Sequence, residues 1–348
     1  MKNNRLVYIL ISILTIWLTV NTVSTNKEKE RGIEENINKY VVSGFSTDLT
    51  KVVDSVKSSV VTVNADGTIS SGFVYKQDEN KVYVITSYHG IENAISIYVT
   101  FDNAYVTTAK VVHNDIFSDI AILEIETPYE IKPMVLGDSS ICTTGEFVIS
   151  IGTPTSIDYA GTVELGLISN ELISIENEIT VNDKKYSYFE DLIQISSNLK
   201  PGYSGAPIIN MKGEVIGMCL MNDDSGNNFV LPINEIRTLC DRYFVSDSAH
   251  KVQLGIKGIY VNKLENYEKS YLNLSLETIN GLYVLKVKEN SISNIAGVKA
   301  GDVIKSINGK DIANTNDYLN AVYTNETSFE FIVNRNNEDL KFIGVIND

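Results

Sequence analysis

The chain has 348 residues, enough for two or three domains, and its 43% hydrophobic and 21% charged residues are typical of a globular protein with a sizeable core. Its 44 Asp and Glu residues outnumber its 29 Lys and Arg residues, which gives a formal net charge of −15. Because nucleic-acid backbones are bound by clustered cations, this balance argues against a nucleic-acid partner.

The first 26 residues predict a membrane segment. Lys2 and Arg5 precede an uncharged apolar run that continues to about Asn26, and about 20 apolar residues are needed to span a bilayer. The positive-inside rule keeps the two cations cytoplasmic, so we expect the remaining chain on the extracytoplasmic side of the cell membrane. No clear small-x-small cleavage site follows, residues 22–24 being nearest. An uncleaved signal anchor is therefore favoured over a removed signal peptide.

Residues 27–45 carry many charges and predict a solvated linker. Apolar positions at helical spacing then predict a short helix near Thr47, followed by a strand at Val60–Val63. Beyond this strand, helical periodicity is nearly absent to residue 240, and short β-rich runs follow one another. The clearest runs are 72–75, 82–86, 95–99, 107–112, 120–123, 147–151, 166–169, 192–195, 208–209 and 215–218. This pattern predicts antiparallel barrels or sandwiches. Residues 46–243 are enough for two small barrels packed together, in which case the active site would lie between them.

A loop rich in glycine lies between the runs at 192–195 and 208–209. Gly202 and Gly205 flank Ser204, and glycine allows both unusual turns and close approach to a substrate. A tight hairpin would have the same composition. A catalytic serine also needs a base and a group that orients the base, so this interpretation depends on a suitable His and Asp.

His89 is the candidate base. It follows the strand-like run 82–86, where its ring would face a cleft, although a hydrogen-bonded core imidazole is the alternative. His113 is expected in a polar turn at 113–115 and His250 in a linker, so both are expected at the surface.

Asp119 is the candidate orienting group. It directly precedes the apolar run 120–123, where a buried carboxylate needs a hydrogen-bond donor such as an imidazole N–H. A turn aspartate, as expected for Asp115, is the alternative. The chain order His89, Asp119, Ser204 is that of the chymotrypsin-type arrangement and differs from the subtilisin and α/β-hydrolase orders.

Three motifs, Thr86–His89, Ser118–Leu123 and Pro201–Pro207, resemble the active-site motifs of the HtrA (Deg) serine proteases. The resemblance covers about residues 46–348. Further similar segments are 48–61, 136–139, 151–154 and 161–169.

The resemblance implies a role for each motif residue. Ser204 would be the nucleophile, His89 the general base and acid, and Asp119 the group that fixes the imidazole tautomer. The backbone N–H groups of Gly202 and Ser204 would form the oxyanion hole. Asn198 would lie at the floor of the primary specificity pocket, and since it carries no charge we expect small aliphatic residues rather than basic ones to be preferred.

Two positions depart from the family pattern. The family usually has Asn before the serine and Gly two places after it, whereas this chain has Tyr203 and Ala206. Neither change removes a catalytic atom. Because position 203 is not Asp, the resemblance also implies that the chain does not use trypsin-like activation by a new N-terminus.

The last hundred residues predict a second domain, residues 250–348. Residues 296–312 resemble the signature of a PDZ domain and include Asn308-Gly309, a strong two-residue hairpin signal. An amphipathic helix is expected at 317–323. The strand-like runs of this part are 254–261, 281–287, 329–333 and 340–343.

PDZ domains bind an extended peptide at a sheet edge and capture its C-terminal carboxylate with backbone N–H groups. Gln253, Leu254, Gly255 and Ile256 resemble this carboxylate-binding loop, the alternative being that they only open a strand. Peptide C-termini are therefore expected partners.

The sequence predicts a mainly β fold: a chymotrypsin-like double β-barrel followed by a PDZ domain, with an N-terminal transmembrane helix. We expect a serine endopeptidase that cleaves unfolded, misfolded or exported proteins at the outer face of the membrane. The resemblance implies homotrimers or higher assemblies. A membrane-tethered PDZ scaffold or chaperone without proteolytic activity, and an unrelated esterase, are the alternatives.

Neither a metal nor a cofactor is expected, because the three histidines are far apart and no carboxylate-histidine pair has ligand spacing. Cys142, Cys219 and Cys240 show no paired spacing, and an odd number is not a disulfide framework. We interpret them as small buried hydrophobic residues, with a single disulfide bridge as the open alternative.

Overall fold

The computed structural model describes residues 48–181, 184–222, 226–246 and 250–346. The predicted membrane anchor (1–26) and linker (27–45) lie outside these ranges. Within them, no helix is long and apolar enough to cross a membrane. Residues 48–56 are helical, as the apolar spacing predicts, and a 3-10 turn at Lys57–Ser59 leads into the first strand.

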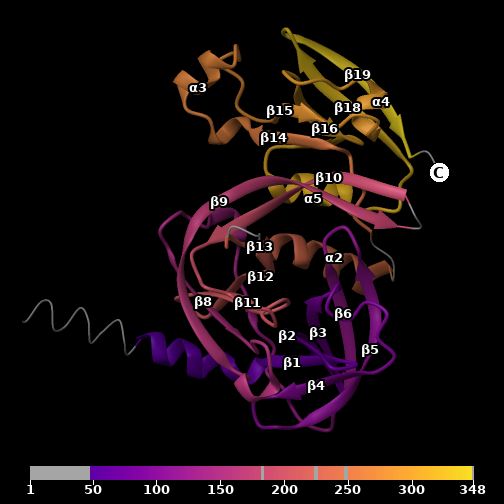
Figure 1. Cartoon of the computed structure of the whole chain (residues 1–348). Helices are drawn as coiled ribbons and strands as arrows, with labels where there is room; N and C mark the ends of the chain where they lie inside the picture. Colours follow the sequence, from indigo (N-terminus) through magenta and orange to yellow (C-terminus); the bar gives the residue numbers. More distant parts are fainter. Residues whose placement is uncertain (1–47, 182–183, 223–225, 247–249, 347–348) are drawn as a thin grey trace, which may run out of the picture. The chain divides into compact units, whose positions relative to one another are not determined.

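Six antiparallel strands close into the first barrel (Figure 1). They are β1 (Val60–Ala65), β2 (Thr68–Asp78), β3 (Lys81–Ser87), β4 (Ile97–Phe101), β5 (Val106–Asp115) and β6 (Ile120–Glu126), in the order β1-β2-β3-β6-β5-β4. Closure leaves no free sheet edge. Ser87 at the end of β3 pairs with Ile120 at the start of β6, so His89 and Asp119 emerge beside each other at one rim.

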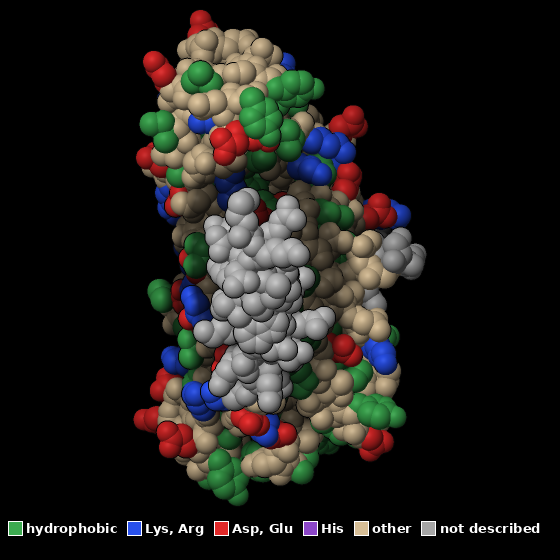
Figure 2. All heavy atoms as spheres, turned by 90° about the vertical axis from the view of Figure 1, so that its left-hand side faces the viewer, with side chains coloured by type: hydrophobic (Ala, Val, Ile, Leu, Met, Phe, Trp, Pro, Cys, Tyr) green, Lys and Arg blue, Asp and Glu red, His purple; other side chains and the backbone are tan. Residues whose placement is uncertain are grey.

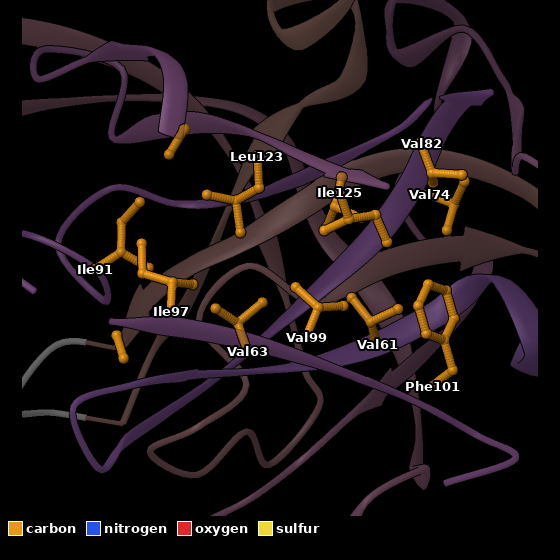
Figure 3. Close-up of a cluster of buried hydrophobic side chains, with 13 residues drawn as sticks. Val61, Val63, Val74, Val82, Ile91, Ile97, Val99, Phe101, Leu123 and Ile125 are labelled. Carbon is orange, nitrogen blue, oxygen red and sulfur yellow. The ribbon is translucent and has the colours of Figure 1, made fainter. Parts of the chain in front are cut away.

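The first barrel is filled by hydrophobic side chains, mostly aliphatic, and Ala109 and Val111 of β5 pack against this core as partly buried residues. Thirteen residues form this core, and Figure 3 shows Val63, Val99 and Leu123 pointing toward one another from three different strands. The alternation of buried and exposed residues is clear in β4, where Ile97, Val99 and Phe101 are buried. Such alternation is what a strand requires when only one face packs on a core.

The second barrel follows, and its elements are β7 (Val135–Leu136), η2 (Ser139–Ile141), β8 (Phe147–Gly152), η3 (Ile157–Tyr159), β9 (Thr162–Val181), β10 (Lys184–Ile195), β11 (Pro207–Asn210), β12 (Glu214–Asn222), β13 (Asn228–Pro232) and α2 (Ile233–Ser246). The strand order is β11-β8-β9-β10-β13-β12-β7, and an additional pairing of β11 with β12 closes the ring. Tyr203 and Ala206 both belong to the core of this barrel. The Tyr203 ring is 1% exposed, and its hydroxyl donates to the carbonyl oxygen of Thr162 at 3.1 Å.

Helix α2 corrects the expectation that helical periodicity is nearly absent up to residue 240. Ile233, Ile236, Leu239 and Cys240 recur at helical spacing and are all fully buried. The run Phe229–Pro232 before them is a strand, so a strand and a helix follow each other without a loop. The preceding β-rich pattern concealed the change of period.

The expected surface position of His113 and the expected polar turn at 113–115 are also wrong. His113 and Asp115 both belong to strand β5, where they are 9% and 2% exposed. The His113 ring stacks on Tyr243 of helix α2, with ring centroids 5.1 Å apart. His113 is therefore buried because it packs against helix α2, which the sequence pattern did not reveal. The His250 side chain is 65% exposed, as predicted.

The C-terminal domain is a sheet with short helices. Its elements are β14 (Ile256–Tyr260), η4 (Val261–Lys263), α3 (Asn266–Tyr271), β15 (Leu282–Val287), α4 (Ile292–Ala296), β16 (Val303–Ile307), β17 (Lys310–Asp311), α5 (Thr315–Val322), β18 (Ser328–Arg335) and β19 (Glu338–Val345). The order is β14-β15-β16-β18-β19, with β17 paired to β16. Asn308 and Gly309 join β16 to β17 with φ of 49° and 73°, which confirms the predicted hairpin turn. Helix α5 confirms the helix predicted at 317–323 within two residues.

The surface carries both signs of charge. On the face drawn in Figure 2, lysine and arginine side chains are interspersed with aspartate and glutamate side chains. In the interior, Cys142, Cys219 and Cys240 are free and buried. Burial raises the pKa of the Cys142 and Cys219 thiols to about 12, so neither is a reactive thiolate at neutral pH.

Candidate active site

Ser204 lies on the loop between β10 and β11, and two glycines shape this loop. Gly202 and Gly205 have φ of 100° and 85°, in the left-handed region that favours glycine. A Cβ at Gly202 would lie 2.2 Å from the carbonyl oxygen of Thr153, and one at Gly205 would lie 2.1 Å from that of Ser71. Because both obstacles are backbone atoms, a side chain at either position would force the loop to move.

A buried serine of strand β2, Ser71, ties this loop to the first barrel. Its hydroxyl donates to the carbonyl oxygen of Gly202 at 2.7 Å and accepts from the N–H of Thr153 at 2.9 Å. Its own N–H donates to the carbonyl oxygen of Ser204 at 2.8 Å. Sequence reasoning missed Ser71, and the available signal was a pair of serines, Ser70-Ser71, within a run that is otherwise apolar.

His89 lies two residues beyond β3 and contacts both other candidate residues. Its Nδ1 is 2.6 Å from Asp119 Oδ2, and its Nε2 is 3.1 Å from Ser204 Oγ. When Nδ1–H donates to the carboxylate, Nε2 of the neutral ring is free to accept the serine proton. The hydrogen bond to Asp119 raises the His89 pKa above its ordinary value, against the opposing effect of desolvation. The Ser204 hydroxyl has a second acceptor in the carbonyl oxygen of Leu220 at 3.3 Å.

Asp119 ends the turn between β5 and β6. It has φ of 52°, an uncommon value for a residue with a side chain. Its carbonyl oxygen accepts from the N–H of Tyr88 at 3.0 Å, and its Oδ1 accepts from the N–H of His89 at 2.7 Å. The carboxylate therefore binds His89 through both the main chain and the ring, which fixes the orientation of the imidazole.

Two backbone N–H groups beside Ser204 are unpaired within the described residues, those of Gly202 and of Ser204 itself. The carbonyl of Pro201 accepts from Thr155 N–H at 2.8 Å, and that of Tyr203 accepts from Ala206 N–H at 2.7 Å. In a trans peptide the C=O and N–H bonds point in opposite directions, and all described peptides are trans. Each N–H therefore points away from these partners.

Asn198, the residue expected at the floor of a specificity pocket, is exposed. It lies between the buried residues Ser197 and Leu199. Its role stays a prediction. Among the described residues, no cluster of three or more His, Cys, Asp or Glu side chains could hold a metal ion.

The predicted carboxylate-binding loop precedes β14. Leu254 and Ile256 are buried, and Gly255 has φ of 76°. Its backbone is held by two hydrogen bonds, from Lys288 N–H to Gly255 O at 2.8 Å and from Ser293 N–H to Leu254 O at 3.2 Å. Gln253 and Gly255 line a pocket of about 770 Å³, together with apolar, aromatic and basic side chains that include Phe117, Tyr186, Ile292 and Lys288.

Comparisons with known proteins give two matched domains. Residues 70–218 match the trypsin-like peptidase domain family, and residues 253–343 match the PDZ domain family. The chain is 34% identical over 259 residues to the serine protease Do-like HtrB of Bacillus subtilis (strain 168), covering 73% of this chain and 56% of that protein. It is 30% identical over 284 residues to the serine protease Do-like HtrA of Lactobacillus helveticus, covering 78% of this chain and 66% of that protein. The chain thus spans little more than half the length of several curated relatives.

Solved structures show the same fold. The HtrA-type protease AlgW with a tripeptide aligns with a TM-score of 0.58 at 22% identity, covering 85% of this chain and 95% of that one. The serine endoprotease from Yersinia pestis aligns with a TM-score of 0.53 at 21% identity, covering 85% and 96%. The matched domains and relatives together show that the chain belongs to the HtrA family, as a trypsin-like peptidase domain followed by a PDZ domain.

Proposed function

We propose that the chain is a serine endopeptidase in which His89, Asp119 and Ser204 form the catalytic triad. The observation that carries the proposal is the continuous contact from Asp119 Oδ2 through the His89 ring to Ser204 Oγ, at 2.6 Å and 3.1 Å. In the sequence, His89 is 30 residues from Asp119 and 115 residues from Ser204. The three side chains have the chain order and the geometry that nucleophilic acyl transfer requires. The names of the relatives, all serine proteases, point to the same reaction.

In this mechanism Ser204 Oγ attacks the carbonyl carbon of the scissile peptide bond while His89 Nε2 takes the hydroxyl proton. The imidazolium then gives this proton to the departing amine, which leaves an acyl group on Ser204. Water repeats the sequence and releases the acid. Asp119 stabilises the imidazolium and holds the proton on Nδ1 throughout.

The unpaired N–H groups of Gly202 and Ser204 would bind the oxyanion of the tetrahedral intermediate. Loss of one such donor typically costs about 100- to 1000-fold in kcat. The hydrogen bond from Ser71 to the Gly202 carbonyl supports this role because it holds the next peptide unit in place.

The substrates would be unfolded, misfolded or exported proteins at the outer face of the cell membrane, to which the N-terminal segment anchors the chain. The apolar run in residues 1–26 supports this placement. The PDZ domain would bind peptide C-termini at Gln253–Ile256 and direct or regulate cleavage. Asn198 would favour small aliphatic residues in the specificity pocket, and homotrimers or higher assemblies would form.

The proposal is tested by cleavage of casein by the full-length chain beside Ser204→Ala, with and without a hydrophobic C-terminal peptide. Loss of the nucleophile is expected to lower kcat roughly 10⁶-fold, effectively to zero. A fluorophosphonate should label wild-type Ser204 and should fail to label His89→Ala. Ser275→Ala, which changes an exposed serine of the PDZ domain, is the control and should cleave and be labelled normally.

Each outcome has a distinct meaning. Cleavage that survives in Ser204→Ala would contradict the assignment of the nucleophile. Absence of both cleavage and labelling in the wild type, with peptide still bound, would support a PDZ scaffold without proteolytic activity. Stimulation by the peptide would make the PDZ domain a regulator of the protease.

A further inference from the structure

The turn that carries Asp119 spans residues 116–119 and is closed by the pairing of Asp115 with Ile120. Asp119 itself is in the left-handed region, with φ of 52°. A non-glycine residue keeps such a conformation only when its surroundings hold it there. The contacts of the preceding residues therefore decide where the Asp119 carboxylate points.

Ser118 and Asp115 form the inner part of this turn. Asp115 Oδ1 accepts from the N–H of Ser118 at 2.9 Å and contacts its hydroxyl at 3.0 Å. Asp115 Oδ2 accepts from the N–H of Lys251 at 2.8 Å. Ser118 is fully buried, so its hydroxyl has no access to water that could replace a lost partner.

The outer partner of Ser118 comes from the PDZ domain. Tyr323 follows helix α5, and its hydroxyl oxygen lies 2.5 Å from Ser118 Oγ and 2.9 Å from a carboxylate oxygen of Glu235 in helix α2. Lys251 Nζ also donates to the Glu235 carboxylate, at 2.5 Å. Tyr323, Glu235 and Lys251 are 0%, 3% and 8% exposed. The two β-barrels and the PDZ domain belong to one compact unit, Ser55–Asp348.

We propose that Tyr323 is a positioning residue for Asp119: its hydroxyl holds Ser118, and Ser118 holds the turn that aims the Asp119 carboxylate at His89. The inference rests on the proposed triad. It means that a side chain of the PDZ domain helps to hold the triad in its geometry. Ser118 is the residue directly before Asp119, so movement of the one is transmitted to the other through a single peptide unit. The protease site is thus complete only while the PDZ domain keeps Tyr323 in this position.

The test compares Tyr323→Phe with wild type in the full-length chain. The substitution keeps the buried ring and removes only the hydroxyl. A displaced Asp119 leaves His89 poorly oriented, so kcat should fall roughly 10- to 100-fold while KM changes little. Tyr283→Phe is the matched control, since it removes a tyrosine hydroxyl from strand β15 of the same domain, and it should leave kcat unchanged.

A pH profile separates positioning from a general loss of stability. The hydrogen bond to Asp119 raises the His89 pKa, and the nearby Glu92 adds a smaller effect that the substitution does not touch. In Tyr323→Phe the acid limb of kcat/KM should therefore move to lower pH. Partial unfolding would lower the amplitude of the profile without moving this limb.

Ser118→Ala provides a second variant, which decides the question if Tyr323→Phe fails to fold. The double variant should lose no more activity than the larger single loss, because both changes break one chain of contacts. The His89 titration, followed by NMR in a Ser204→Ala background, should show the same fall in pKa without any need for catalysis.

Unchanged kcat and an unchanged His89 titration in the folded variants would overturn the role of Tyr323. Wild-type chain without Ser204-dependent cleavage would instead contradict the proposed function. In that case the His89 titration still decides whether Tyr323 positions Asp119.

Discussion

The loop that carries Ser204 and the turn that carries Asp119 are held by different kinds of contact. The loop depends on left-handed glycines and on main-chain groups bound by Ser71. The turn depends on two buried polar side chains, Ser118 and Asp115. Asp115 accepts from the N–H of Lys251, in the segment that follows helix α2, and Ser118 contacts Tyr323, which follows helix α5. Backbone shape therefore holds Ser204, whereas a network of side chains holds the Asp119 carboxylate.

This difference predicts how each part fails. A loop fixed by backbone geometry is sensitive to any added side-chain atom, because its obstacles are main-chain oxygens that cannot rotate away. A turn fixed by side chains is sensitive to the loss of one hydroxyl or one charge, because buried polar groups that lose a partner find no water. Substitutions at the two places should therefore give different changes in activity.

Among the substitutions that compare the turn with the loop and leave Ser204 in place, the largest effect is expected for Asp119→Asn. The amide is nearly the same size as the carboxylate but favours the wrong imidazole tautomer and does not stabilise the imidazolium, so kcat should fall about 10⁴-fold. Since the hydrogen bond to Asp119 raises the His89 pKa, the residual activity should be lost at a lower pH than in the wild type. Steady-state kinetics across pH measure both effects, and a loss of less than tenfold would contradict the assigned role of Asp119.

A smaller loss is expected for Gly202→Ala. The new Cβ would lie 2.2 Å from the Thr153 carbonyl oxygen, so the loop must shift and the nearby N–H would leave the oxyanion site. Loss of that donor lowers kcat by about 100- to 1000-fold. Gly67→Ala is the matched control, because Gly67 has nearly the same φ, 96°, with no atom within 4 Å of an added Cβ. Equal losses of activity in the two variants would show that contact with Thr153 is not the cause.

The same difference explains what the sequence could predict. The Ser204 loop is local, so the run Pro201–Pro207 contains the glycines that shape it and is readable as a motif. The β-rich runs, the hairpin at Asn308-Gly309 and helix α5 are also set by local pattern. Each predicted run overlaps an observed strand, although 166–169 and 192–195 cover only small parts of β9 and β10. His89 and Asp119 required an argument from chain order, because only the pairing of β3 with β6 brings them together.

The remaining features depend on contacts between distant segments. Ser71 lies 131 residues before the Gly202 carbonyl that it binds, and Tyr323 lies 205 residues after Ser118. The pair Ser70-Ser71 marks a polar position in an apolar run, but no local feature of the sequence identifies the distant partner of Ser71 or of Tyr323. His113 was expected at the surface for the same reason, since its burial depends on Tyr243 in a helix that the sequence pattern did not reveal.

The smallest effect is expected for Tyr203→Phe. This substitution makes the comparison sharpest because it removes a hydroxyl from the residue that directly precedes Ser204. The Tyr203 hydroxyl donates to the carbonyl oxygen of Thr162 at 3.1 Å and contacts no part of the triad. Loss of this hydrogen bond should lower the free energy of unfolding by about 1 kcal/mol, seen as a lower urea midpoint. Activity should change less than about threefold, since the ring that packs the loop remains. The contrary result would be that Tyr203→Phe lowers kcat as much as Tyr323→Phe. That result would show that proximity to Ser204 matters more than the contact with Ser118. The distinction between a loop held by its backbone and a turn held by side chains would then fail.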